Sequence, residues 1–221
     1  EINIVTDKNR KYVTALMSYF GRLNYNFDNR YLFEFNARYD GSSKFEPSNR
    51  WDLFYGTSLA WRIQQEAFLR DVEWLQDLKL RISYAEMGNQ SGINNYDGIQ
   101  LYSFQSSSGA YVGSEKLPLI QTSGTLSSKE REWERVKNYN LGLDFGFLGG
   151  RLSGSVDAFM KRNDNMLVNI TLPGTLGDKA PLLNDGKFKT WGLEGEINYR
   201  GKVGEFDYHV GGTLTFARDK V

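Results

Sequence analysis

The sequence predicts an all-β fold: a segment of an antiparallel up-and-down transmembrane β-barrel with about eight strands. Three observations predict this fold. Apolar and polar residues alternate in eight separate segments, short and long connections alternate between those segments, and aromatic residues gather beside the short connections. Because successive side chains of a strand point to opposite faces, each of these segments has one apolar and one polar face.

The stretch RYLFEFNARYD at 30–40 is the clearest of these segments, with Tyr31, Phe33 and Phe35 alternating with Glu34 and Asn36. The same period-2 pattern predicts strands at 19–28, 30–40, 52–63, 78–84, 139–145, 152–161, 191–200 and 206–216. In a soluble half-buried sheet the apolar face meets a protein core, whereas in an outer-membrane barrel it meets lipid and the polar face lines a wet lumen.

One segment between the third and fourth strands has a different period. Phe68, Val72 and Leu75 lie at helical spacing, so we expect a short amphipathic helix over 64–77.

The connections favour the barrel over a soluble domain. Short turns are expected at 28–29, 149–150 and 201–204, and long connections at 41–50, 86–138 and 163–190. In an up-and-down arrangement this alternation places all long connections at one end, as in outer-membrane barrels. A connection of about 50 residues is also unusual for a compact soluble domain.

Aromatic residues near the short turns predict a membrane girdle, because amphipathic rings prefer the boundary between headgroups and acyl chains. The predicted lipid-facing or girdle residues are Tyr25, Phe33, Phe35, Trp61, Phe145, Tyr199 and Tyr208. The alternative is that these are the core aromatics of a β-sandwich.

Composition argues against several functions. The 221 residues carry a net charge of zero, so no nucleic-acid partner is implied, and the absence of cysteine excludes thiolate chemistry. With His209 as the one histidine, neither a zinc site nor a Ser/His triad is expected. We therefore expect a protein that is not an enzyme and has no metal or cofactor.

The long loops carry the candidate contacts for cargo or a partner, since they mix aromatic, amide and acid groups that could stack on sugars or hold a peptide. These candidates are Tyr96, Asp97, Gln100, Tyr102, Phe104 and Tyr111. Loops of this composition also occur for solubility alone.

The charged run at 129–135 precedes the fifth predicted strand. If that strand extends through the run, Glu130, Glu132 and Glu134 face the lumen as vestibule acids. The bases Arg131, Arg135 and Lys137 then face outward, where they could meet phosphates of the outer-membrane lipid. The alternative is a solvated loop or a short helix with Glu130 and Glu134 one turn apart.

The chain resembles the SusC/RagA-type TonB-linked outer-membrane transporters. The resemblance rests on stretches in family order that include SLAWRI, DLKLRISYAEMGNQ and YNLGLDFGFLGGRLSGSVD, at 18–51, 58–63, 77–90, 139–157 and 186–199. At 84–89 the chain has YAEMGN, where family members usually have YGVTGN or similar, and we expect this segment to be a loop.

This resemblance implies the barrel of a transporter in the outer membrane of a Gram-negative, Bacteroidetes-like bacterium. It implies a plugged barrel of the ~22-stranded class, a SusD-like surface lipoprotein as partner, and TonB-driven import of an oligosaccharide or peptide. No plug domain or TonB box is visible in residues 1–221, so the chain is expected to be an interior part of the barrel. A soluble β-rich binding module and a passive porin-type barrel remain as alternatives, and the cargo stays open.

Overall fold

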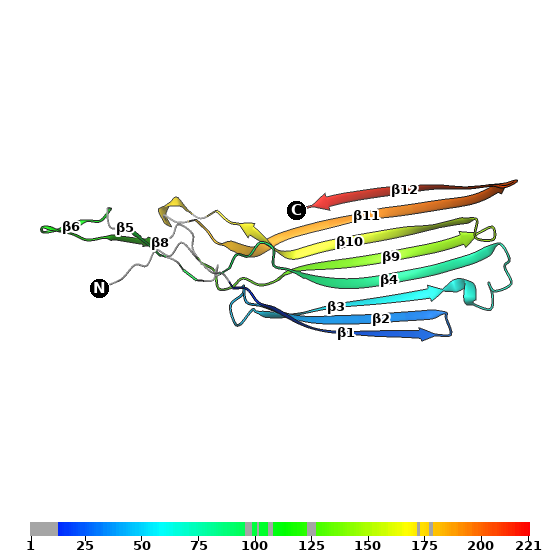
Figure 1. The fold of residues 1–221 in the computed structure, drawn as a ribbon, viewed down its shortest axis with the longest axis horizontal. Helices are drawn as coiled ribbons and strands as arrows, with labels where there is room; N and C mark the ends of the chain where they lie inside the picture. The colour runs from blue at the N-terminus through cyan, green and yellow to red at the C-terminus, as the bar shows by residue number, and fades with distance from the viewer. Residues whose placement is uncertain are drawn as a thin grey trace.

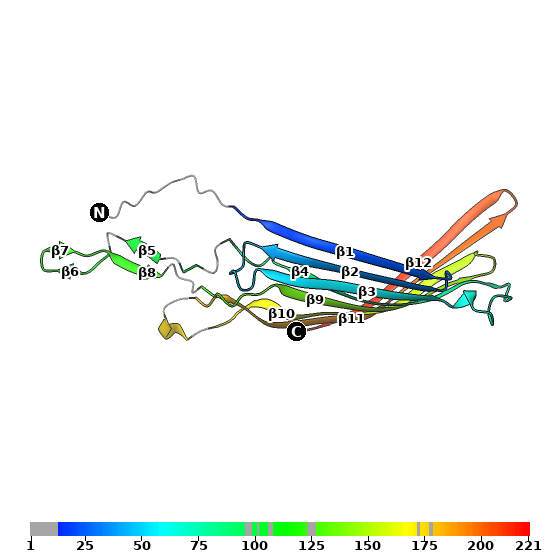
Figure 2. The ribbon, with the colours of Figure 1, turned by 90° about the horizontal axis from the view of Figure 1, so that it is seen from below.

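The computed structural model describes residues 13–95, 99–100, 102–105, 108–122, 127–171, 173–176 and 179–221. Its main element is one antiparallel sheet with the strand order β1-β2-β3-β4-β9-β10-β11-β12 (Figure 1). The strands are β1 (Leu16–Phe27), β2 (Tyr31–Ser42), β3 (Trp51–Arg62), β4 (Leu75–Asn89), β9 (Glu134–Phe147), β10 (Leu152–Asn169), β11 (Leu182–Val203) and β12 (Phe206–Lys220). The sheet is long, twisted and a single layer thick (Figure 2), and it confirms the predicted all-β, up-and-down arrangement.

The connections are sorted between the two ends of the sheet. The links from β1 to β2, β3 to β4, β9 to β10 and β11 to β12 lie at one end, here named the turn end. The links from β2 to β3, β4 to β9 and β10 to β11 lie at the other, the loop end (Figure 1). The first turn is a tight hairpin in which Asp28 and Asn29 have φ of 52° and 53°, and the Arg30 amide donates to the Phe27 carbonyl at 3.0 Å. Such left-handed pairs match the twist of the strands that they join.

A narrow ribbon projects beyond the loop end (Figures 1 and 2). It is built from two short antiparallel pairs, and we name it the distal ribbon: β5 (Tyr102–Gln105) with β8 (Leu119–Thr122), and β6 (Tyr111–Val112) with β7 (Glu115–Lys116). Within its described residues, the expected long connection at 86–138 therefore contains the four short strands β5 to β8. The connection at 163–190 is shorter than expected, because β10 continues into it to Asn169 and β11 begins at Leu182; among its described residues is a 3-10 turn, η2 (Gly174–Leu176).

The predicted helix at 64–77 is wrong. A 3-10 turn, η1 (Ile63–Gln65), and further turns occupy this segment, and β4 already begins at Leu75. Leu75 pairs with Phe147 of β9, while Phe68 is 69% exposed, so a helix would have no surface on which to bury its apolar face. No helix within the described residues is long and apolar enough to span a membrane.

The predicted loop at 84–89 is also wrong, because the whole YAEMGN segment belongs to β4. Its residues pair with β9 in an unbroken register from Tyr84–Tyr139 to Asn89–Glu134. Backbone pairing along β9 thus carries β4 further toward the loop end than the alternation alone predicted.

The register separates the sheet into two faces. In the apolar face, rows such as Tyr19–Tyr39–Leu53 run across neighbouring strands, and in the polar face rows such as Arg81–Gly142–Asp157 do so. The apolar face is not covered by protein, since Leu59 and Ile82 are each 53% exposed. The main buried apolar cluster, formed by Phe45, Phe54, Ile93 and Trp133, lies at the loop end. The sheet is therefore a wall with two accessible faces.

Candidate transport wall and loop platform

The seven predicted girdle residues lie on the apolar face. At the turn end Trp61 stacks on Tyr31 at 6.5 Å between ring centroids and Phe145 stacks on Phe147 at 5.4 Å, while the tilted rings of Tyr199 and Tyr208 are 6.1 Å apart. The register places all seven in apolar rows: Tyr25, Phe33, Phe35, Trp61, Phe145, Tyr199 and Tyr208. Their contact with lipid stays a prediction.

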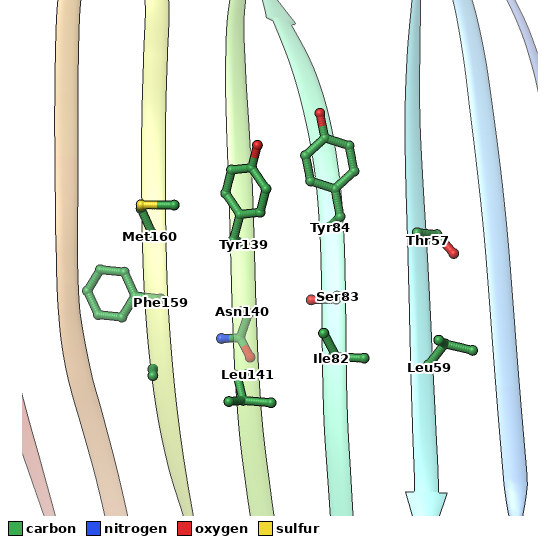
Figure 3. Close-up of a pocket in the computed structure, with 11 residues that line it drawn as sticks. Thr57, Leu59, Ile82, Ser83, Tyr84, Tyr139, Asn140, Leu141, Phe159 and Met160 are labelled. Atoms are coloured by element: carbon green, nitrogen blue, oxygen red, sulfur yellow. The ribbon is translucent and has the colours of Figure 1, made fainter.

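A second aromatic belt lies on the same face near the loop end and was not predicted. Trp51 stacks on Tyr39 at 5.0 Å and on Tyr19 at 6.1 Å, and Tyr84 lies 5.0 Å from Tyr139. Tyr84 and Tyr139 point their hydroxyls toward the loop end (Figure 3). This orientation suits a ring whose polar tip is wet and whose body is in lipid. The period-2 pattern contained Tyr19, Tyr39, Tyr84 and Tyr139 but not Trp51, and the predicted girdle residues were mainly those beside the short turns.

A shallow apolar groove of about 450 Å³ continues from this belt toward the turn end (Figure 3). Its aliphatic lining comes from neighbouring strands: Leu59, Ile82, Leu141, Ala158 and Met160. A groove with this lining can accept hydrocarbon.

Ion pairs join neighbouring strands on the polar face. Arg81 of β4 binds Asp144 of β9 at 2.7 Å and Asp157 of β10 at 3.1 Å, and Lys79 also binds Asp144, at 2.7 Å. Arg81 can cross β9 because Gly142 lies between: a Cβ there would be 2.4 Å from Asp157 Oδ1 and 2.7 Å from Arg81 Nη2. Elsewhere on this face, Arg22 binds Glu34 and Arg38 binds Asp40, each at 2.6 Å. Such a charged surface requires water or polar protein against it.

A carboxylate fastens the turn end. Glu66 accepts hydrogen bonds from the Tyr31 hydroxyl at 2.7 Å, the Trp61 indole at 2.9 Å and Arg30 Nη1 at 3.3 Å. The hydrogen bond from Tyr31, then that from Trp61 and the charge of Arg30, lower the pKa of Glu66 despite its partial desolvation. One side chain of the β3–β4 connection thereby joins the first hairpin to the end of β3.

The buried cluster at the loop end joins the β2–β3 connection, the strand β3 and both ends of the β4–β9 connection. Trp133 stacks on Phe45 at 4.8 Å and meets Phe54 edge-on at 5.7 Å, and Ile93 completes the cluster. The Trp133 indole donates to the Arg50 carbonyl at 3.2 Å. Sequence reasoning missed this cluster, although Trp133 inside a charged run and Phe54 at a polar-face position were the available signals.

The predicted vestibule acids have different surroundings. Glu134 begins β9 and is 7% exposed, accepting from Asn89 at 2.6 Å and from the Leu167 amide at 2.7 Å. Glu130 and Glu132 are exposed and line a polar hollow of about 650 Å³ together with Asp185. A vestibule role therefore stays a prediction for Glu130 and Glu132, whereas the carboxylate of Glu134 is occupied within the fold.

The bases of the same run do not lie as expected. Arg135 and Lys137 share rows with Gly88 and Glu86, on the side of Tyr139 as predicted. However, the Arg135 guanidinium is bound by two acids, Asp52 at 2.5 Å and Glu86 at 2.6 Å. Arg131 is buried, with 8% of its surface exposed, and it donates to the Leu182 carbonyl at 3.0 Å. The pairing of β3 with β4 ends at Gly56–Ala85, so Asp52 can approach across the unpaired part. The expectation that Arg131 and Arg135 are available for lipid phosphates is wrong.

The candidate cargo residues are spread along the protruding segment. Tyr102, Phe104 and Tyr111 are exposed on the distal ribbon, at 67%, 46% and 71%. The Gln100 side chain accepts from the Ser127 amide at 2.9 Å, which ties the base of the ribbon. Tyr96 and Asp97 lie outside the described residues. Contact of these six residues with cargo or a partner stays a prediction.

Known proteins resemble this chain over nearly its whole length. The family described as TonB dependent receptor-like, beta-barrel matches residues 3–221. TonB-dependent receptor SusC of Bacteroides thetaiotaomicron is 36% identical over 210 residues, covering 94% of this chain and 21% of SusC. TonB-dependent receptor P3 of Formosa agariphila is 32% identical over 207 residues, covering 94% of this chain and 20% of P3. The chain thus spans about a fifth of the length of these relatives.

Solved structures agree in fold. A chain of the RagAB peptide importer in its open-open state matches with a TM-score of 0.81 and 27% identity, over 93% of this chain and 22% of that one. The siderophore receptor PirA of Pseudomonas aeruginosa, at 13% identity, has a TM-score of 0.58 over 93% of this chain and 32% of its own, and shows the fold alone. The chain belongs to the TonB-dependent receptor-like β-barrel family, in its SusC/RagA-type branch, and is an outer-membrane β-barrel segment.

Proposed function

We propose that this chain forms part of the wall of an outer-membrane importer that takes up an oligosaccharide or a peptide. The observation that carries the proposal is the pairing of one exposed apolar face, bounded by two aromatic belts, with a polar face whose charges are matched across strands. The apolar face meets lipid and the polar face borders the lumen. The belts fit this role: Tyr31 and Tyr39 are eight residues apart on β2, about 27 Å along the strand, which a barrel's tilt reduces to about 20 Å, near the usual apolar band.

In this proposal the loop end faces the outside of the cell. There the distal ribbon offers an exposed apolar side, which includes the cross-strand pair Phe104–Ile120, to a SusD-like surface lipoprotein or to the cargo. The energy for import comes from the TonB complex, through parts of the transporter other than this segment. Relatives named for a peptide importer and for SusC support import as the activity.

The test is a strain that lacks the gene for the whole transporter, grown on defined glycans and peptides as sole nutrients. We expect loss of growth on one class, restored by the intact gene. The intact gene should not restore growth when the TonB system is inactivated. Normal growth of the deletion strain on every glycan and peptide supplied would contradict the proposal, and growth that persists without TonB would favour a passive porin.

A further inference from the structure

One row on the apolar face consists of bases on four neighbouring strands. Lys137 of β9 is opposite Arg162 of β10, Arg162 is opposite Lys189 of β11, and Lys189 is opposite Lys220 of β12. We name these four residues the basic row. They lie one row beyond the loop-end aromatic belt, since the preceding row contains Tyr139, Met160, Trp191 and Arg218.

Like charges in opposite positions repel, so such a row requires compensation. Asp164 supplies part of it, at 3.4 Å from Lys137 and 2.9 Å from Arg162. The Lys189 ammonium lies 5.3 Å from the centre of the Trp191 ring. Glu86 of β4 is opposite Lys137 but its carboxylate binds Arg135. Among the described ion pairs, Asp164 therefore binds two of the four bases, Lys137 and Arg162, and none involves Lys189 or Lys220. The side chains of Lys137 and Arg162 remain 30% and 45% exposed, so an external anion can reach them.

We infer that the basic row binds the phosphate groups of an anionic lipid in the outer leaflet, with the lipid A of lipopolysaccharide as the occupant. The position of the row favours a lipid as the occupant. The row lies just beyond the loop-end aromatic belt on the apolar face, at the level where lipid headgroups begin. The ion pairs of Arg81 lie on the opposite, polar face. Ammonium and guanidinium groups are the usual protein ligands of phosphate. The inference rests on the proposed orientation, in which the loop end is outside.

The experiment uses the full-length transporter purified in detergent, titrated with lipopolysaccharide while binding and heat stability are measured. The variant Lys189→Gln/Lys220→Gln removes two charges of the row. At about 1 kcal/mol for each base near an anionic surface, lipopolysaccharide should bind roughly 30-fold more weakly to this variant. The control is Lys161→Gln/Arg200→Gln, which removes two bases from the polar face and should leave binding unchanged.

Equal binding by the wild type and Lys189→Gln/Lys220→Gln would overturn the inference. The inference would also be overturned if inorganic phosphate raised the heat stability of the transporter as much as lipopolysaccharide does at the same phosphate concentration. That result would indicate an anion site that does not recognise lipid. If the double variant does not fold, Lys220→Gln alone, at the end of β12, should weaken binding roughly fivefold. Growth on the cargo is measured separately, so failure of the lipid site and failure of the import proposal give different results.

Discussion

Arg81 joins three strands of the wall, and Gly142 is the residue that allows it to do so. The register places Arg81, Gly142 and Asp157 in one row of the polar face. A Cβ at Gly142 would lie 2.4 Å from the Asp157 carboxylate, so a larger residue there requires the ends of the Asp157 and Arg81 side chains to move. The backbone conformation does not itself require a glycine, since Gly142 is not among the positive-φ glycines.

Gly142→Ala should therefore push Arg81 and Asp157 apart. We expect a loss of about 1–2 kcal/mol, from crowding and a weakened, partly exposed ion pair. The measurement is the urea midpoint of the barrel refolded in lipid. The matched control is Gly195→Ala on β11, where the nearest atom to a new Cβ is 4.0 Å away. Equal midpoints for Gly142→Ala and the wild type would show that the Arg81–Asp157 contact does not depend on this glycine.

A charge on the apolar face tests which side of the wall meets lipid. Phe35 is midway between Tyr31 and Tyr39 on β2, and the next residue, Asn36, faces the other side. Phe35→Arg should cost about 2–4 kcal/mol at the bilayer midplane and reduce the amount of assembled barrel. Asn36→Arg should assemble normally. The measurement is the amount of folded barrel in outer-membrane fractions for each variant. Equal amounts for Phe35→Arg and Asn36→Arg would contradict the assignment of the apolar face to lipid.

At the scale of elements, side-chain hydrogen bonds of Glu66 and Gln64, and not a helix, hold the segment between β3 and β4 in place. Glu66 accepts three hydrogen bonds from residues of β2, β3 and the first turn. These bonds lower the pKa of Glu66 in the folded protein. Its carboxylate therefore stabilises the fold at pH values above the pKa that Glu66 has in the unfolded chain, and this contribution is lost as the pH falls through the pKa in the folded protein.

Glu66→Gln should accordingly lower the heat stability of the barrel at neutral pH. The difference from wild type should shrink as the pH falls through the lowered pKa of Glu66, because the carboxyl of the wild type then becomes protonated. Heat-stability curves at about pH 7 and about pH 3 measure this. Glu73→Gln, in the same connection but at an exposed residue, is the control. A deficit of Glu66→Gln that is as large at low pH as at neutral pH would show that its charge is not the cause.

The distal ribbon offers a comparison between its two sides. Phe104 and Ile120 are opposite each other on one side, while Ser103 and Gln105 belong to the other side of β5. Phe104→Ser/Ile120→Ser should reduce capture of the lipoprotein partner or cargo by the full transporter at least tenfold, because exposed apolar pairs of this kind are typical of interfaces. Ser103→Ala/Gln105→Ala should have little effect. The measurement is the affinity of the purified transporter variants for the purified partner or cargo. If both variants bound as tightly as the wild type, the proposed role of the distal ribbon would be contradicted.

At the scale of the whole molecule, the alternation of residues was sufficient to predict eight strands, their order and the sorting of their connections. Where the prediction failed, contacts between distant segments decided the structure. Leu75 pairs with Phe147 and ends the expected helix, and Trp133 is buried by Phe45 and Phe54. Likewise, Arg135 has outward parity but binds Asp52, which is distant in sequence. Periodicity assigns a side chain to a face, but it does not identify the partner that the side chain meets.

The central claim is a wall that crosses the outer membrane with its loop end outside, and accessibility of two tags in intact cells tests it most directly. One tag is placed at Gly113, at the tip of the distal ribbon, and the other at Gly149, in the turn between β9 and β10. We predict that an impermeant label or antibody reaches the tag at Gly113 in intact cells and reaches the tag at Gly149 only after the outer membrane is opened. The reverse pattern would contradict the orientation, and labelling of both tags in intact cells would contradict the membrane crossing itself.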